Sequence, residues 1–194
     1  MSANLALEPA LSRPELLAKP TLAALTELER AHGAEAAAQV LTAPIDPDLA
    51  DTAAFCETYG VRLEESANCV VLAGKRGGET TFAACLVLAT TRADVNGLVR
   101  RHLGVRKISF APMDEAVGLT GMEYGGITPL GLPTDWPVLI DRAVAEAPQV
   151  VVGSGIRGSK LWLPGALLAA LPNAQVLEEL GRPIEPVEPG PDAS

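Results

Sequence analysis

Two glycine-rich segments contain the residue types in this chain that are best suited to binding chemistry. The first, residues 121–131, holds four glycines and one proline within eleven residues. Glycine allows backbone angles and close approaches that a Cβ would forbid, whereas Pro129 fixes its own φ and removes an amide donor. Such a stiff loop can present its own N–H and C=O groups to a ligand. We therefore expect a site built from backbone groups, although a tight connection alone would leave the same pattern.

The second segment, residues 153–158, places Gly153, Gly155 and Gly158 within six residues. It lacks the Gly-Lys-Ser/Thr ending of a Walker A loop, and its glycines do not match the dinucleotide-binding pattern. We interpret it as the second wall of a pocket whose first wall is the loop at 121–131. A purely structural turn is the alternative interpretation.

Composition limits the classes of function. The net charge is −9 and the pI is about 4.7, which argues against broad, sequence-independent binding to nucleic-acid phosphates. Docking of one short RNA end in a local pocket stays open. Hydrophobic residues make up 48% of the chain and aromatic residues 4%, so the core is expected to consist mainly of Ala, Val, Leu and Ile.

Metal, cofactor and membrane sites are not expected. The three cysteines form no CxxC pair and only two histidines are present, so neither a zinc site nor a disulfide framework is indicated. The N-terminus lacks the pattern of a signal peptide, and no apolar run reaches membrane-spanning length. A cytoplasmic location is therefore expected.

The spacing of apolar residues, glycines and prolines predicts short strands interleaved with short helices. Helices are expected around residues 14–33, 46–60, 92–103, 112–118, 141–145 and 164–171. Strands are expected around residues 38–42, 68–73, 81–89, 107–111, 136–140, 149–153, 160–163 and 174–176. The irregular alternation argues against a doubly wound fold and predicts a mixed α/β fold whose mixed sheet curls toward a barrel.

Both ends of the chain are expected to lie outside the main domain. Residues 1–12 are predicted to be a loose tail before a helix that Ser12 caps and Pro14 opens. Pro20 is expected to break or kink this helix. Residues 182–194, with four prolines, are predicted to be disordered.

Taken in order, six segments resemble the YbaK/ProX aminoacyl-tRNA deacylase family, which is related to the editing insertion of bacterial prolyl-tRNA synthetases. The segment 119–131 looks like the family's Thr-Gly…Gly-Gly-Ile-Ser-Pro-Leu-Gly signature. The other five similar segments are residues 68–89, 103–111, 138–141, 150–158 and 162–168. The resemblance covers roughly residues 36–180, which we predict to be the editing domain, with an accessory part at 1–35 and a tail at 181–194.

The resemblance implies a free-standing trans-editing hydrolase without a cofactor. Its partner would be the 3′ end of a mischarged aminoacyl-tRNA carrying a small amino acid, and a synthetase is a further candidate partner. The catalytic water would be oriented by backbone groups and a ribose hydroxyl, with a developing oxyanion stabilised by backbone amides. The residues so implicated are, for catalysis, Gly126, Gly153, Gly155 and Asn68, and for substrate binding, Gly125, Ile127, Thr128, Pro129, Leu130, Ser154 and Asp141. A bulky residue at Gly126 is expected to abolish turnover without unfolding the domain.

One position departs from the family. Asn68 stands where the family usually carries a lysine that contacts the terminal nucleotide, and asparagine brings no charge. Neither Lys75 nor Lys107 is assigned that role. The alternative function is therefore a catalytically lapsed binding module for an aminoacyl ligand, a synthetase or a tRNA.

Several other residues have a structural interpretation beside a functional one. Cys69 is expected to be buried and inert, with a thiol nucleophile as the sharper interpretation. Asp141 is a candidate cap for the following helical turn. The basic run ending at His102 is interpreted as a solvated helix end, with RNA phosphate contact as the alternative. A third function, interaction or dimerisation through the N-terminal helix, also stays open.

Overall fold

The computed structural model describes residues 5–184. The prediction of disorder for residues 182–194 is wrong at 182–183, which form a strand paired with residues 91–92. Residues 1–4 of the predicted N-terminal tail and residues 185–194 lie outside the described residues. Within the described part, the helices are α1 Lys19–His32, α2 Ala34–Ala38, α3 Thr52–Tyr59, α4 Arg100–His102, α5 Met113–Thr120, α6 Arg142–Ala145 and α7 Gly165–Ala169. The 3₁₀ turns are η1 Ala10–Ser12, η2 Pro14–Leu16, η3 Pro47–Leu49 and η4 Leu63–Glu65, and η5 Val95–Val99 is a π-helical turn. The strands are β1 Glu8–Pro9, β2 Leu41–Pro44, β3 Ala67–Arg76, β4 Glu79–Leu88, β5 Thr91–Ala93, β6 Lys107–Phe110, β7 Val138–Asp141, β8 Val150–Gly153, β9 Ser159–Leu163, β10 Ala174–Leu177 and β11 Gly181–Pro183.

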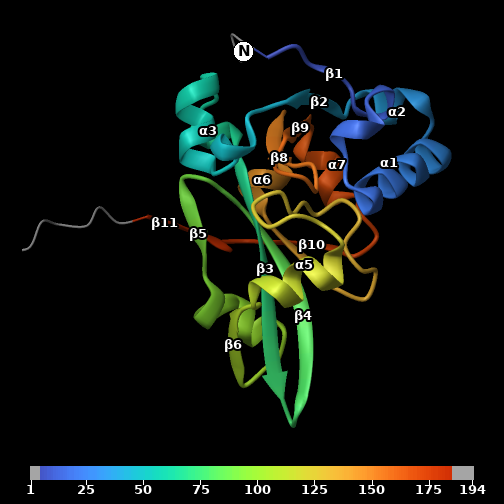
Figure 1. The fold of residues 1–194 in the computed structure, drawn as a ribbon. Helices are drawn as coiled ribbons and strands as arrows, with labels where there is room; N and C mark the ends of the chain where they lie inside the picture. Colours follow the sequence, from blue (N-terminus) through green and yellow to red (C-terminus); the bar gives the residue numbers. More distant parts are fainter. Residues whose placement is uncertain (1–4, 185–194) are drawn as a thin grey trace, which may run out of the picture.

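A long hairpin organises the larger sheet. Its strands β3 and β4 pair over ten residues, and the two-residue connection Gly77-Gly78 has positive φ at both positions. This conformation suits the tight turn of a twisted hairpin. The sheet order is β10-β7-β4-β3-β6, with β4–β7 and β7–β10 parallel and the other pairs antiparallel. In Figure 1 the hairpin extends well beyond the rest of the molecule.

The second sheet is antiparallel, in the order β1-β2-β9-β8, and the pair β11-β5 forms a small third sheet. One isolated parallel bridge between Ser66 and Val151 joins the first two sheets. The mixed α/β class is confirmed. Within residues 5–184 the curled sheets remain separate and do not close into a barrel.

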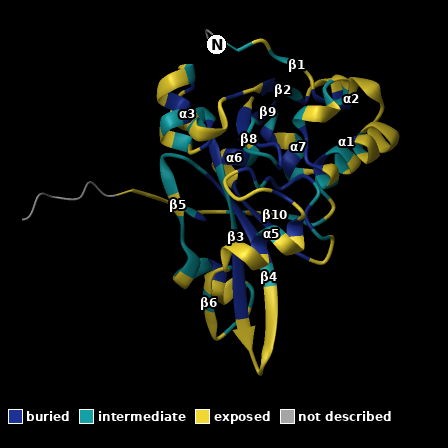
Figure 2. Ribbon diagram, viewed as in Figure 1, coloured by how far each residue is buried: buried dark blue, intermediate teal, exposed yellow. Residues whose placement is uncertain are grey.

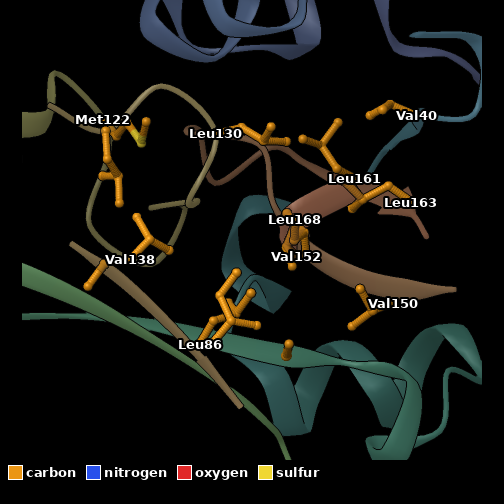
Figure 3. Packing of buried hydrophobic residues seen from close by; sticks show 14 of the residues in the cluster. Val40, Leu86, Met122, Leu130, Val138, Val150, Val152, Leu161, Leu163 and Leu168 are labelled. Carbon is orange, nitrogen blue, oxygen red and sulfur yellow. The ribbon is translucent and has the colours of Figure 1, made fainter. Parts of the chain in front are cut away.

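The main core lies where the two larger sheets approach each other. Leu86 and Val138 of the five-stranded sheet face Val152 and Leu161 of the four-stranded sheet, with Leu168 of α7 between them (Figure 3). A smaller cluster beneath α3 contains Phe55 and Trp162. Buried residues fill the centre of the molecule and the near half of the hairpin, while the hairpin end is exposed (Figure 2). Aliphatic side chains thus dominate the core, as the composition predicted.

The N-terminal segment differs from the predicted loose tail. Glu8 pairs with Thr42, Ala10 is fully buried, and its amide donates to Val40 O at 2.8 Å. Ser12 caps no helix, because its Oγ donates to Pro9 O instead. Pro20 does not kink a helix but lies in the first turn of α1, where its missing N–H costs nothing. Hydrophobic residues of this segment therefore belong to the folded body.

Candidate functional site

A cleft of about 370 Å³ opens between the start of α3, the first half of β3, the end of β6 and the loop before β7. Four residues predicted for the site line it: Asn68, Gly125, Ile127 and Gly153. The remaining lining residues are Ala50, Asp51, Thr52, Ala67, Cys69, Val70, Val71, Phe110, Ala111, Ala116, Tyr124 and Lys160. Segments far apart in the chain thus meet at one place.

The two glycine turns are packed backbone against backbone. The amide of Gly155 donates to Gly126 O at 2.7 Å, and Glu123 N donates to Gly155 O at 2.9 Å. A Cβ on Gly153 would lie 2.2 Å from Gly126 O, and a Cβ on Gly126 would lie 2.5 Å from the carbonyl carbon of Ile156. Only glycine permits this approach. We call these contacts between residues 123–127 and 153–156 the glycine seam.

The glycine seam limits which amides can serve a ligand. Because Gly155 N already donates to Gly126 O, it is not free to stabilise an oxyanion. Gly126 is buried behind the cleft surface, and its own amide donates to Glu123 O at 2.9 Å. Gly125 and Gly153 are therefore the glycines of the seam that reach the cleft.

The second half of the first loop belongs to the core. Thr128 and Ser154 are fully buried, and Pro129 and Leu130 are buried as well. The Ser154 hydroxyl lies 2.7 Å from that of Ser159. These four predicted substrate-binding residues do not line the cleft, because their side chains fill the space behind it.

The segment before α1 covers the outer side of the glycine seam. Ala18 N donates to Ser154 O at 3.1 Å, and Ser159 Oγ donates to Leu16 O at 2.5 Å. A Cβ on Gly155 would lie 2.4 Å from the Cβ of Ala18, and one on Gly131 would lie 2.4 Å from Pro20 O. The turns are therefore held from behind by the N-terminal residues.

Asp141 has a structural position. Its Oδ1 accepts from Ala143 N at 2.9 Å, which caps α6, and its Oδ2 accepts from Gly181 N at 2.7 Å. The capping interpretation is confirmed, and Asp141 is absent from the cleft lining.

Asn68 is half-buried at the cleft wall. The hydroxyl of Thr52 donates to Asn68 Oδ1 at 2.5 Å. This bond fixes the amide group and leaves its NH₂ to donate to a ligand. The position keeps a hydrogen-bond donor, but it carries no charge.

Lys160 is a charged residue of the cleft lining that sequence reasoning missed. It lies on β9 with 8% of its surface exposed, its Nζ donates to Ala50 O at 2.8 Å, and it stands 5.4 Å from the centroid of the Phe55 ring. No carboxylate of the described residues lies within 4 Å of its ammonium group. Burial lowers the pKa of Lys160, and the nearby Cys56 and Asp51 partly oppose this shift. A lysine inside the strand Ser-Lys-Leu-Trp-Leu was the available signal, because an unpaired buried charge is costly and clusters at functional sites.

The cysteine at the cleft does not have the properties of a nucleophile. Desolvation raises the pKa of the Cys69 thiol to about 12, with a smaller contribution from Cys85. The thiol therefore stays protonated near neutral pH. Neither histidine lines the cleft, and His102 Nε2 lies 2.6 Å from Gln175 Oε1.

Two aromatic side chains stand at the cleft with most of their surface exposed. Phe110 at the end of β6 is 64% exposed and Tyr124 is 59% exposed. Arg157 lies beside Tyr124, with Nε 3.1 Å from Pro47 O and Nη1 3.4 Å from Tyr124 O. Exposed aromatic faces of this kind can stack against nucleobases.

Other classes of site receive no support from the described residues. No group of three or more His, Cys, Asp or Glu side chains in residues 5–184 is arranged to hold a metal ion. None of the helices in this range has the length and apolar character needed to cross a bilayer.

Comparison with solved structures shows the same fold elsewhere. A candidate trans-editing enzyme for prolyl-tRNA synthetase matches with a TM-score of 0.63 and 21% identity, over 80% of this chain and 95% of that chain. A hypothetical protein matches with a TM-score of 0.68 and 19% identity, over 82% of this chain and 99% of that chain. The model of the aminoacyl-tRNA editing domain family matches residues 46–171, which contain most of the cleft and both glycine turns. This chain belongs to the aminoacyl-tRNA editing domain family.

Proposed function

We propose that this protein is a trans-editing deacylase of the cytosol that hydrolyses the ester between a small, wrongly attached amino acid and the terminal ribose of a tRNA. Membership in the editing-domain family supports the reaction class. The observation that carries the proposal is the meeting of Asn68, Gly125, Gly153 and Lys160 in one cleft. A volume of about 370 Å³ is near the lower end for ligand pockets, which favours a small aminoacyl group.

The reaction requires positioning more than a strong base. An oxygen of water adds to the ester carbonyl carbon, and the bond from that carbon to the ribose oxygen then breaks. The ribose oxygen leaves with a proton that originates from the water, giving free amino acid and tRNA. Because the ester is already activated, orientation and oxyanion stabilisation supply most of the catalysis.

Polar groups across the cleft fit the substrate's charges. The ammonium of Lys160 and the amide NH₂ of Asn68 are suited to stabilising the oxyanion or a ribose oxygen. Asp51 contributes a carboxylate to the lining, which can accept from the α-ammonium of the aminoacyl group. The backbone at Gly125 and Gly153 forms the opposite side.

The exposed aromatics extend this arrangement to the nucleoside. Phe110 and Tyr124 offer ring faces on which the terminal adenine can stack, at about 1–3 kcal/mol per base. The cleft then receives the aminoacyl ribose, while the rest of the tRNA stays outside.

The test is release of amino acid from a panel of tRNAs charged with Ala, Ser, Cys or Thr. We expect the purified protein to deacylate at least one of them well above the uncatalysed rate. Lys160→Met should reduce that rate by about 10², the typical effect of losing an oxyanion donor. Arg30→Gln, on the exposed side of α1, is the matched control and should retain the rate. Background rates across the whole panel would contradict the proposal.

A binding module without hydrolysis is the second candidate, and Asn68 favours it. The position where the resembling family carries lysine is occupied here by a neutral residue held by Thr52. Such a protein would bind aminoacyl-tRNA, or a synthetase that delivers it, and would leave the ester intact.

A further inference from the structure

The charges of this acidic protein are unevenly distributed along the chain. Residues 75–107 contain seven lysines and arginines and two acidic residues, for a net charge of +5. The rest of the chain contains eight lysines and arginines and 22 acidic residues, for a net charge of −14. The overall value of −9 therefore hides one strongly basic region.

The fold places four of the seven lysines and arginines of this region near the far end of the hairpin. A groove of about 490 Å³ lies between the hairpin end, η5–α4 and β6. Its polar lining residues are Lys75, Asn96, Arg100, Arg106, Lys107 and Ser109. We call this lining the basic groove.

The cations of the basic groove are not neutralised within the protein. None of its four lysines and arginines forms an ion pair within 4 Å among residues 5–184. Lys75 and Lys107 lie directly opposite each other in the β3–β6 register, an arrangement of like charges that destabilises a sheet. The nearby Asp94 accepts from the amides of Gly97 and Leu98 and from Arg182. Asp94 therefore does not neutralise the lysines and arginines of the groove, and their mutual repulsion remains. Such repulsion is expected of a surface that binds an anion.

A further groove, lined by Ala73, Lys75, Ser109, Phe110 and Glu115 among others, lies between the basic groove and the cleft and shares lining residues with both. Lys75, Ala73 and Val71 follow at steps of two residues on β3, so they share a face, and Val71 lines the cleft. At about 3.3 Å per residue, the path from Val71 to Lys75 is roughly 13 Å long. Phe110 ends the strand that begins with Lys107 and also lines the cleft.

We propose that the basic groove binds the sugar–phosphate backbone of the RNA whose aminoacylated end enters the cleft. The inference rests on the proposed function for the identity of that RNA. Unpaired cations offer phosphate contacts, while the acidic remainder of the surface repels the polyanion elsewhere. The RNA is thereby directed along β3 and β6 toward Phe110.

An acidic protein segment is the competing occupant. RNA is favoured because the cations lead toward two exposed aromatic rings, and because the polar lining residues named above offer donors rather than an apolar anchor. Stacking rings next to a basic track are typical of surfaces that bind single-stranded nucleic acid.

The test is binding of uncharged tRNA, followed by fluorescence anisotropy across a salt series. The variant Arg100→Glu:Lys107→Glu removes two phosphate contacts and places Glu opposite Lys75, so the β3–β6 pair exchanges a repulsive cross-strand contact for a favourable one. We expect at least tenfold weaker binding at low salt. The slope of log K against log[salt] should be smaller in magnitude by about 1.4 for single-stranded or 1.8 for duplex contacts.

Two further variants make the result decisive. Arg100→Gln:Lys107→Gln should produce the same change of slope with a smaller loss of affinity. Lys19→Glu:Arg30→Glu changes the net charge by the same amount on α1, far from the hairpin end (Figure 1), and should leave the slope unchanged. Equal affinity and slope for all variants would overturn the inference. So would RNA binding that persists in Arg100→Glu:Lys107→Glu while binding to polyglutamate is lost, because the groove would then suit an acidic protein.

Uncharged tRNA separates this inference from the proposed function. A wild-type protein that binds tRNA through the groove but hydrolyses none of the charged panel would retain the inference and refute the deacylase. Hydrolysis and tRNA binding that are both unchanged in the groove variants would refute the inference and retain the deacylase.

Discussion

The two walls of the cleft are built on different principles. The glycine wall is made of backbone, with Gly125 and Gly153 at the surface and hydrogen bonds of the seam behind them. The opposite wall is made of side chains, among them Asn68 held by Thr52 and Lys160 held by Ala50 O. The first wall has little freedom to change, because a Cβ at Gly153 meets backbone atoms and one at Gly125, where φ is positive, meets the Arg157 guanidinium. The second wall can change its chemistry while the shape of the cleft persists.

The fold therefore requires the glycines of one wall, whereas the side chains of the other wall can differ without loss of the fold. The side-chain wall carries a neutral residue, Asn68, and a buried cation, Lys160, and other side chains could replace either one without changing the backbone of the wall. In this chain the glycine wall contributes to the fold, whereas the proposed hydrolysis depends on the side-chain wall. Each of the following variants tests one side of this comparison.

The largest effect is expected for Gly153→Ala. Its Cβ would lie 2.2 Å from Gly126 O, so the seam must open, at a cost of about 3 kcal/mol or more in the free energy of unfolding. Urea denaturation measures the loss. Gly158→Ala in the same turn is the control, because its Cβ would lie 3.9 Å from the nearest atom, on Pro47. Equal stability of the two variants would contradict a rigid glycine wall.

The same geometry corrects the expectation for Gly126. A bulky residue there was predicted to abolish turnover while leaving the domain folded. A Cβ at Gly126 meets three backbone atoms of Ile156 within 2.9 Å, so the fold itself should be lost with the activity. An inactive but fully stable Gly126 variant would restore the original expectation.

The next largest effect concerns Lys160 and its dependence on pH. Because burial lowers the pKa of Lys160, its positive charge should disappear at a pH below the ordinary value for lysine, and kcat/KM should fall there. Lys160→Arg keeps its charge, so the alkaline fall should move to higher pH. Initial rates corrected for spontaneous ester hydrolysis measure the shift. Identical profiles would remove Lys160 from the mechanism.

The same shift has a consequence for stability. Between the lowered pKa and the ordinary value, the unfolded chain binds more protons at Lys160 than the folded chain does, so the free energy of unfolding should rise with pH in that window. Lys160→Met should lack this contribution. Denaturation at several pH values separates it from other titrating groups, which are common to both proteins.

A smaller effect is expected for the two exposed aromatic residues of the cleft. Phe110→Ala and Tyr124→Ala each remove one exposed ring, and the loss of stacking should raise KM for aminoacyl-tRNA by about tenfold with little change in kcat. Leu119→Ala is the matched control, since Leu119 is 49% exposed but does not line the cleft. An equal response of all three variants would point to a general surface effect.

The smallest effect is expected for Asn68→Lys. If Lys160 already supplies the positive charge, a second lysine should change kcat/KM by less than about tenfold. The substitution also removes the bond to Thr52, which tends to reduce any gain. Activity that appears only in this variant would instead identify the wild-type protein as a lapsed enzyme.

Local patterns predicted the elements that local chemistry determines. The polar stretch 74–78 predicted a hairpin loop, although β3 continues to Arg76 and only Gly77-Gly78 form the turn. Asp141 was correctly named as a candidate cap for the following turn. The positions of Thr128 and Leu130 could not be predicted in this way, because a loop residue near a pocket can face either the ligand or the core. Which side it faces depends on the tertiary packing of the whole loop, whose last residue, Gly131, lies against Pro20, more than a hundred residues earlier in the chain. Lys160 was missed for the same reason, since its neighbour Ala50 is brought close only by the tertiary fold.

The N-terminal residues 16–20, which pack behind the glycine turns, have a practical consequence for the design of shorter forms of this protein. A fragment that starts at the family match, residue 46, would omit Leu16, Ala18 and Pro20, and would expose Gly155 and Gly131 to water. Loss of activity in such a fragment would report a collapsed scaffold rather than a missing catalytic group. We therefore expect the smallest stably folded unit of this chain to begin upstream of residue 46, in a segment that the family model does not match.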